Sequence, residues 1–150
     1  MKKLLVTFTL AMFVTVSSLF ANSTEEVNQR VVSSFNKEFK MAKEVEWETA
    51  KDLYKATFKM NEQVMFAFFT KDGEMVAVSR NLSSSQLPIQ LSASLKKSYN
   101  DFWITDLFEL SSKNETGYYV TLENADQKLI LKSYGLSGWE VYRKEKKEAI

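Results

Sequence analysis

The chain has 150 residues, 20 lysines and arginines against 19 aspartates and glutamates, and no cysteine or histidine. Without histidine or cysteine, a Ser-His-Asp triad, a cysteine nucleophile and an ordinary zinc or copper site are excluded. The near-neutral charge is unlike that of nucleic-acid-binding proteins, because phosphates require a basic excess. We therefore predict a protein that is not an enzyme, holds no cofactor or metal, and binds no nucleic acid.

The first 21 residues are typical of a signal peptide. Lys2 and Lys3 precede an apolar run from Leu4 to Phe20, and Ala21 is a small residue at the expected cleavage point. The alternative is a membrane anchor, but the run is short for a span and contains five serines and threonines. We predict that residues 1–21 are removed, that no transmembrane segment follows, and that residues 22–150 form one periplasmic or secreted domain.

A helix is predicted at the start of this domain. Ser23-Thr24-Glu25-Glu26 has the sequence of a capping box, with Ser23 as the N-cap. An apolar stripe at helical spacing follows, formed by Val27, Val31, Phe35 and Phe39. The helix is expected to run from about Thr24 to about Met41.

Four strands are predicted next, because apolar and polar residues alternate and turn residues separate the runs. Two-residue hairpin loops are expected at Asn61-Glu62 and Asp72-Gly73. Glu44, Glu46 and Glu48 share one side of the first strand, where they form either a calcium-binding row or a solvated edge. We favour the edge, because no glycine-containing loop of oxygen ligands accompanies them. The predicted strands cover 44–48, 53–60, 63–70 and 74–80.

Similar signals return in the second half. Pro88 is placed for the first turn of a second helix with the stripe Leu91, Leu95 and Tyr99. Strands are expected at 103–111, 118–123, 128–134 and 139–144. The pattern Tyr54-x-Ala56-x-Phe58 recurs 64 positions later as Tyr118-x-Val120-x-Leu122. We predict an α+β fold of two tandem duplicated units, about 22–82 and 83–144, each with one helix packed on an antiparallel meander sheet, and about eight strands in total.

Hairpin pairing assigns side chains to the two faces of this sheet, because opposed residues lie on the same side. The loop at Asn61-Glu62 sets Phe58 opposite Met65, and the loop at Asp72-Gly73 sets Phe69 opposite Val76. The face expected to meet the helices then contains Tyr54, Ala56, Phe58, Met65, Ala67, Phe69, Val76 and Val78, followed in the second unit by Tyr118, Val120, Leu122, Leu129, Leu131, Trp139 and Val141.

The opposite face is the candidate binding surface. Apolar groups there alternate with lysine and threonine, a composition typical of protein interfaces, where rigid rings anchor the partner and polar groups orient it. The alternatives are that the first helix or the C-terminal tail covers this face, or that its aromatic pairs only stabilise the sheet. Met75 and Ala77 are also expected on this face. The predicted protein-binding residues are Phe66, Phe68, Tyr119, Ile130, Tyr142, Lys55 and Lys132.

The spaced aromatic and turn residues resemble a known family. Val45-x-Trp47, Tyr54-x-Ala56-x-Phe58, Asp72-Gly73, Asn81-Leu82 and Leu87-Pro88 are similar to the framework of the PepSY-like, β-lactamase-inhibitor-like (BLIP-like) proteins of Bacteroidetes-type bacteria. The resemblance covers roughly 27–143. It implies tandem α+β units and an extracytoplasmic location, and in the inhibitor that names the family the concave sheet face grips an enzyme. The chain lacks that inhibitor's disulfides, because it has no cysteine.

Two functional hypotheses follow. The first is a non-catalytic, exported, inhibitor-like binding module that engages a protein or peptide of the envelope, such as a hydrolase, through the open face of its sheet. The second is a periplasmic carrier that holds a small apolar ligand between the helices and the sheet.

Overall fold

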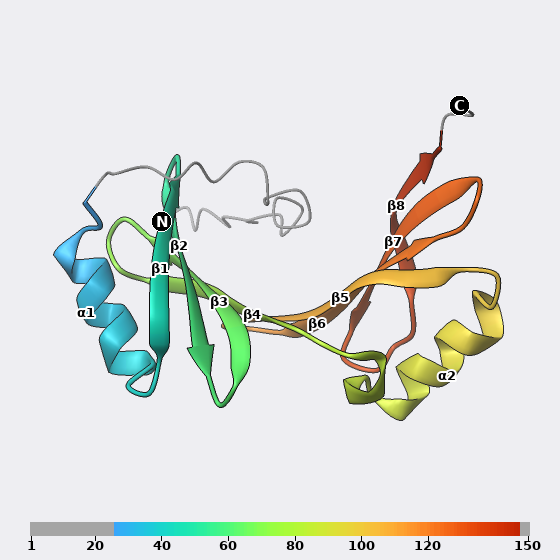
Figure 1. The fold of residues 1–150 in the computed structure, drawn as a ribbon, viewed down its shortest axis with the longest axis horizontal. Coiled ribbons are helices and arrows are strands. Elements are labelled where there is room, and N and C mark those ends of the chain that lie inside the picture. Colours follow the sequence, from blue (N-terminus) through green and yellow to red (C-terminus); the bar gives the residue numbers. More distant parts are fainter. Residues whose placement is uncertain (1–25, 148–150) are drawn as a thin grey trace, which may run out of the picture.

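The structure is a computed structural model that describes residues 26–147, and the predicted signal peptide and Ser23 lie outside these residues. Eight strands form a single antiparallel meander in chain order, and two helices accompany them (Figure 1). No helix within residues 26–147 has the length and apolarity needed to cross a bilayer. The elements are α1 Gln29–Glu38, β1 Lys43–Ala50, β2 Leu53–Met60, β3 Gln63–Thr70, β4 Met75–Asn81, η2 Ser84–Gln86, α2 Ile89–Ser98, β5 Trp103–Ser112, β6 Thr116–Glu123, β7 Gln127–Tyr134 and β8 Glu140–Lys146.

Both helices lie on the same face of the sheet, near its opposite ends (Figure 1). Val31 and Phe35 of α1 pack against Phe58 and Phe69, and α2 packs against a second core through Leu95. The strand register shows that the two cores lie on the same side of the sheet, because cross-strand partners point to the same side. The helix-side pairs continue through the middle strands as Ala67–Val78, Arg80–Glu109 and Leu107–Val120. The other face, which we call the helix-free face, is therefore not covered by any helix within residues 26–147.

Helix α1 begins later than the sequence predicted. Asn28 is its N-cap, and its side-chain oxygen accepts a hydrogen bond from the Arg30 amide at 2.9 Å. Asparagine is among the preferred N-cap residues because it satisfies one of the unpaired amides of the first turn. The predicted start at Thr24 is wrong, but the stripe is confirmed: Val31 and Phe35 are buried, and Val27 and Phe39 pack against the same core.

The β2–β3 hairpin has the predicted register. Phe58 pairs with Met65 across a two-residue loop, and both loop residues, Asn61 and Glu62, have positive φ angles of 51° and 61°. Positive φ at both positions is the mark of a type I′ turn, which matches the twist of the flanking strands. The parity of side chains in this half of the sheet therefore follows from the turn.

The β3–β4 hairpin differs from the prediction by one residue. Thr70 pairs its amide with the Glu74 carbonyl, so the loop has three residues, and a register shift follows it. As a result Phe69 faces Met75, and the prediction that it faces Val76 is wrong, as is the placement of Met75 on the helix-free face. Three-residue loops are commonly followed by a bulge, and the displaced Val76 packs with the aromatic residues of the helix-free face.

In the second half, the residue just before β8 is hydrogen-bonded to α2. The Trp139 indole N–H donates to the Leu91 carbonyl at 3.0 Å, and Trp139 packs against the second core as predicted. Val141, which the sequence also assigned to this core, is 55% exposed. It pairs with Leu131 on the helix side, but it belongs to the edge strand, and α2 does not reach it.

Candidate protein-binding face

The structure places the predicted binding residues together on the helix-free face. Lys55 comes from β2, Phe66 and Phe68 from β3, Tyr119 from β6, Ile130 and Lys132 from β7, and Tyr142 from β8. The cross-strand pairs Lys55–Phe68, Tyr119–Lys132 and Thr121–Ile130 set them on one side. Phe58, at the opposite parity, is 1% exposed and contacts α1 through Phe35, with ring centroids 5.0 Å apart. The predicted division of side chains between the two faces is thus confirmed in these strands.

The middle of this face has its own small core. Phe68, Ala77, Leu110 and Tyr119 are buried, and Phe66, Val76 and Phe108 pack against them. Tyr119 is only 2% exposed. Its ring stacks on Phe108 at a centroid distance of 5.1 Å and meets Tyr142 edge-on at 6.2 Å. Aromatic pairs at these distances add stability beyond the area that they bury.

The expectation of a bare face therefore holds for only some of the predicted residues. Phe68, Tyr119 and Ile130 have exposed fractions of 7%, 2% and 6%, whereas Phe66 and Tyr142 are half-buried. Rings on neighbouring strands pack against each other across the sheet, and this contact shields them from water although no helix covers them. The surface that a partner can touch is the set of half-buried groups around this small core.

Residues of this face that the sequence prediction missed include Phe108, Tyr134 and Gly117. A Cβ atom on Gly117 would lie 3.2 Å from the Tyr134 ring and 3.4 Å from the Tyr119 ring. Glycine inside a strand often marks the close approach of another group, and here it leaves room for two tyrosine rings. That rule is the signal by which Tyr134 could have been found.

Burial raises the pKa of the Tyr119 hydroxyl above its ordinary value, and the adjacent Tyr134 hydroxyl acts in the same direction. The pKa of Tyr119 is higher in the folded state than in the unfolded chain, where it is about 10. The stability that the protonated Tyr119 hydroxyl contributes is therefore complete below about pH 10 and is lost as the pH rises above that value. We expect the free energy of unfolding to fall by roughly 1.4 kcal/mol more in the wild type than in Tyr119→Phe between about pH 9 and about pH 11. Urea unfolding at both pH values measures this difference, and equal losses in the two proteins would contradict it.

Lysines contact the rings at both ends of this face. The Lys55 ammonium lies 5.3 Å from the Phe66 ring centroid and forms an ion pair of 2.5 Å with Glu48. The Lys132 ammonium lies 5.1 Å from the Tyr134 centroid and 5.7 Å from the Tyr142 centroid. Ammonium groups within about 6 Å of a ring centroid are attracted by the negative ring face.

Two of the three glutamates of the acidic row of β1 are paired with lysines of β2. Glu48 pairs with Lys55, and Glu44 pairs with Lys59 at 2.5 Å. The Glu44–Lys59 pair is exposed and pairs of this kind contribute little to stability, but both pairs reduce the negative charge of the edge strand. Within residues 26–147, no group of three acidic side chains is arranged to hold a metal ion.

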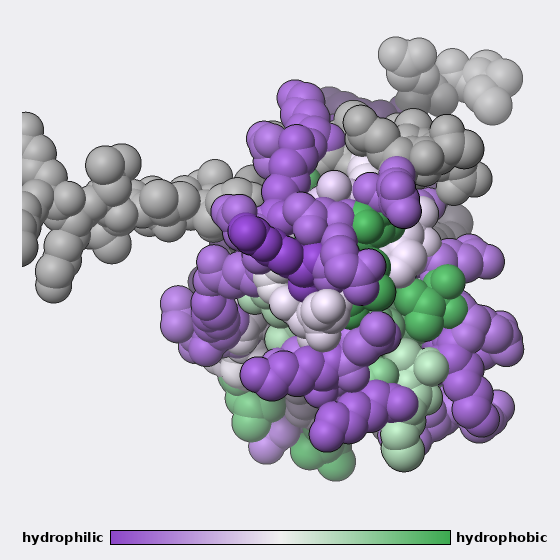
Figure 2. Space-filling model, turned by 90° about the vertical axis from the view of Figure 1, so that its left-hand side faces the viewer, coloured by the Kyte–Doolittle hydropathy of each residue, from purple (hydrophilic) through white to green (hydrophobic). Residues whose placement is uncertain are grey.

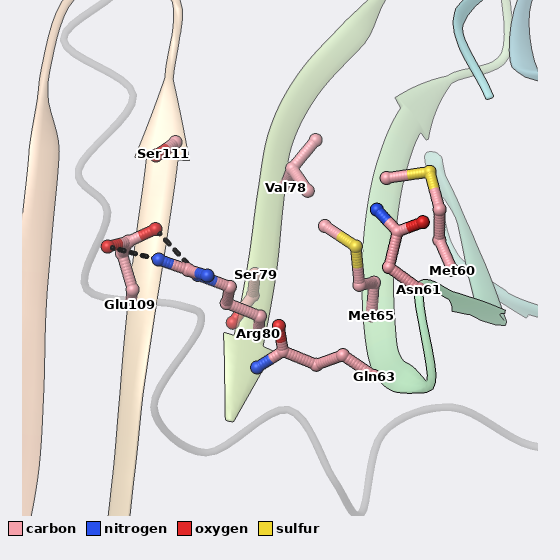
Figure 3. A pocket seen from close by; sticks show the side chains of 9 residues that line it. All are labelled: Met60, Asn61, Gln63, Met65, Val78, Ser79, Arg80, Glu109 and Ser111. Atoms are coloured by element: carbon pink, nitrogen blue, oxygen red, sulfur yellow. Dashed lines mark hydrogen bonds and ion pairs between the residues drawn. The ribbon is translucent and has the colours of Figure 1, made fainter. Parts of the chain in front are cut away.

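A groove of about 270 Å³ lies on the helix side of the sheet, between the β2–β3 turn and strands β4 and β5. Figure 3 shows Arg80 pointing to Glu109 across its floor, with Met60 and Met65 on the other side. The guanidinium donates two hydrogen bonds to the carboxylate, at 3.0 and 3.3 Å, and hydrogen bonding to Glu109 raises the pKa of Arg80. Because the guanidinium and the carboxylate neutralise each other, this ion pair links the two halves of the sheet and has little capacity left to bind a ligand.

Among residues 26–147, those at the end of the molecule that carries α1 offer no comparable surface. Figure 2 shows this end covered mostly by hydrophilic residues, with hydrophobic groups only scattered between them. The outward positions of α1 agree, since Arg30, Ser33, Asn36 and Lys37 are exposed. Single exposed apolar residues are normal on a soluble surface, so the helix-free face remains the strongest candidate.

This chain is an eight-stranded antiparallel meander with two helices on one face and aromatic residues on the other. Its fold is similar to that of solved structures, among them a BLIP-like protein. A BLIP-like protein from Bacteroides fragilis has 22% identity to this chain over 81% of it and 86% of its own length, with a TM-score of 0.69.

Two further structures are equally similar in shape. A DUF2874 family protein from Bacteroides ovatus has a TM-score of 0.72 at 18% identity, over 81% of this chain and 89% of its own. A protein from Bacteroides eggerthii, provisionally described as periplasmic, has a TM-score of 0.72 at 17% identity over the same fractions. No family model matches the chain, and no curated protein matches it. At these identities the likeness establishes the fold, as the sequence resemblance predicted.

Proposed function

We propose that this protein is a non-catalytic, exported binding module, which engages a protein or peptide of the cell envelope through the helix-free face of its sheet. The observation that carries the proposal is the position of both helices on one face, with rings and lysines on the other. Rigid aromatic groups beside cations are the usual anchors of protein interfaces. The BLIP-like fold supports the same reading, and an envelope hydrolase is one candidate partner.

The proposed location follows from the N-terminal sequence and from one structural neighbour. Residues 1–21 are proposed to be a cleaved signal peptide, on the basis of their charge and hydropathy pattern. The provisional description of the Bacteroides eggerthii protein as periplasmic agrees with export. Residues 22–150 would then act as one domain in the periplasm or outside the cell.

We also propose that the two halves, about 22–82 and 83–144, arose by tandem duplication. Each half contains one helix followed by four strands. The order of buried, half-buried and exposed residues over 31–40 is the same, position by position, as the order over 91–100. An identical burial pattern in the two helical segments supports a common origin.

The alternative function, a carrier of a small apolar ligand between helices and sheet, has less support. Phe35 occupies the space between α1 and the sheet and contacts Phe58 and Trp47 at centroid distances of 5.0 and 5.3 Å. A carrier needs an apolar cavity of a few hundred Å³. One groove of that size contains the Arg80–Glu109 ion pair, and a second, of about 370 Å³, is lined in part by the polar residues Asn81, Thr105 and Asp106. Extraction of the purified protein followed by mass spectrometry tests this alternative, because a carrier is expected to yield bound ligand.

The binding proposal is tested by capture of partners from envelope extract. We expect Phe66→Ala/Tyr142→Ala to reduce recovery of the partner at least about tenfold, since truncating two interface anchors costs about 2 kcal/mol or more. Ile89→Ala is the matched control: Ile89 is 78% exposed on α2, on the helix side. Circular dichroism confirms that both variants are folded. Equal recovery of the same partner by the wild type and the double variant would remove the proposal.

A further inference from the structure

Lys132 differs from three other cations of the helix-free face, which form ion pairs, and from Lys128, for which residues 26–147 provide neither an ion pair nor a ring contact. Lys55 is paired with Glu48 at 2.5 Å, Arg143 with Glu145 at 2.7 Å, and Lys147 with Glu123 at 2.9 Å. For Lys132, no carboxylate within residues 26–147 lies at ion-pair distance, and its contacts are the rings of Tyr134 and Tyr142. It is half-buried, so it has lost part of its hydration.

The two tyrosines hold this ammonium in place without using its hydrogen bonds. Attraction to a ring face acts on the charge of the ammonium, while its three N–H donors stay available. Tyr134 is itself fixed, because it packs into the space beside Gly117. Tyr142 is fixed by its edge-on contact with Tyr119, at a centroid distance of 6.2 Å. A cation with a fixed position and free donors is complementary to a single carboxylate.

The surrounding charge makes a polyanion a poor candidate. Two other cations of this end, Arg143 and Lys147, are matched by carboxylates. The chain as a whole is close to neutral, with a formal net charge of +1. One free positive charge between two rings fits one negative charge with apolar neighbours, and binding of a phosphate backbone requires many cations.

We propose that Lys132 is the group on the helix-free face that receives a carboxylate of the partner, between the rings of Tyr134 and Tyr142. The partner is then a protein loop or peptide with an exposed aspartate or glutamate flanked by apolar residues. This inference rests on the proposed function and specifies the chemistry of the partner at that surface.

The test uses the full chain, purified from a bacterial expression host, and a phage-displayed library of random linear peptides as the probe. Selected peptides are assigned to the helix-free face when Phe66→Ala/Tyr142→Ala abolishes their binding. We expect these peptides to be enriched in aspartate or glutamate beside apolar residues. Lys132→Gln is expected to weaken them about 10- to 100-fold, the loss for a hydrogen bond to a charged group.

Lys128→Gln is the matched control. Lys128 lies on the same strand and the same face and is also half-buried, but no ring contact holds it, and it lies in the field of the Asp106 carboxylate. We expect this variant to bind the selected peptides as the wild type does. A peptide with glutamine in place of its glutamate should bind the wild type weakly and lose nothing further on Lys132→Gln, which measures the coupling of the two groups.

The possible failures are distinguishable. Face-directed peptides without acidic enrichment, or peptides insensitive to Lys132→Gln, would overturn the carboxylate inference and leave the binding function intact. Peptides insensitive to every substitution on this face, or the absence of any binder, would overturn both proposals. Self-association of the wild type that Tyr142→Ala abolishes would identify a second copy as the occupant and would also overturn the inference.

Discussion

Replacing Phe35 by alanine is expected to lower the free energy of unfolding by about 3–5 kcal/mol, the range measured for buried phenylalanines. Phe35 is 2% exposed and is the centre of the first core. Its ring contacts four others, with centroid distances of 5.2 Å to Phe39, 5.3 Å to Trp47, 5.0 Å to Phe58 and 6.3 Å to Phe69. The cavity left by alanine would remove the main contact between α1 and the sheet, so the loss should lie near the upper end.

Urea unfolding followed by circular dichroism measures this effect. Phe35→Leu keeps most of the volume and is expected to cost less than half as much as Phe35→Ala. Ile89→Ala, at a position that is 78% exposed, is expected to change the free energy of unfolding by less than about 0.5 kcal/mol. A loss below about 1 kcal/mol for Phe35→Ala would show that α1 does not depend on this contact.

Gly73→Ala is expected to cost about 2–5 kcal/mol, because two penalties act together. Gly73 has a φ of +87°, a conformation that is strained for any residue with a Cβ atom. In addition, the new Cβ would lie 3.0 Å from the Arg30 carbonyl oxygen and 3.0 Å from the Ser34 hydroxyl, both on α1. The backbone of α1 cannot yield without disturbing the core beneath it, so we expect the helix to move away from the β3–β4 turn.

Gly138→Ala separates the two penalties. Gly138 also has a positive φ, of +102°, but a Cβ there would meet nothing within 4 Å. It is therefore expected to show only the conformational cost, about 1–2 kcal/mol. Thermal or urea unfolding of the two variants side by side is the measurement. Equal losses would indicate that contact with α1 plays no part at Gly73.

The β3–β4 turn also connects the helix side of the sheet with the proposed binding face. Its third loop residue allows the register shift that turns Val76 toward Phe66 and Phe68. A change that moves this turn is therefore expected to disturb the first half of the helix-free face. Lys132 is distant in sequence, on β7, and its contacts with Tyr134 and Tyr142 do not involve the turn.

Much of the architecture could be predicted from local patterns. The stripes Val31–Phe35 and Leu91–Leu95 identified both helices, since burial repeats every three to four residues along a helix. The loop at Asn61-Glu62 fixed the pairing of Phe58 with Met65, because a two-residue hairpin loop permits one register. Lys55, Phe66 and Phe68 share one face for the same reason.

Other predictions failed where a distant contact decides the local structure. The β3–β4 loop has one residue more than predicted, at a place where Gly73 fits against α1. The position of Val141 on an edge strand exposes it, although its parity is that of a core residue. Neither effect can be predicted from the spacing of apolar residues. The spacing predicts the face of the sheet to which a side chain points, but not which element covers that face.

The sequence by itself determined the division of side chains between two faces, the two helices and the absence of histidine and cysteine chemistry, because these depend on composition and on periods of two and 3.6 residues. Only the tertiary structure decided that β4 and β5 pair, through Arg80 with Glu109 among others, and so join the two halves into one continuous sheet. The tertiary structure also determines that Phe68, Tyr119 and Ile130 are buried on a face without a helix, and that Lys132 lies between two rings. These features depend on which strands become neighbours in the sheet, and strand pairing is determined by contacts between residues far apart in the chain.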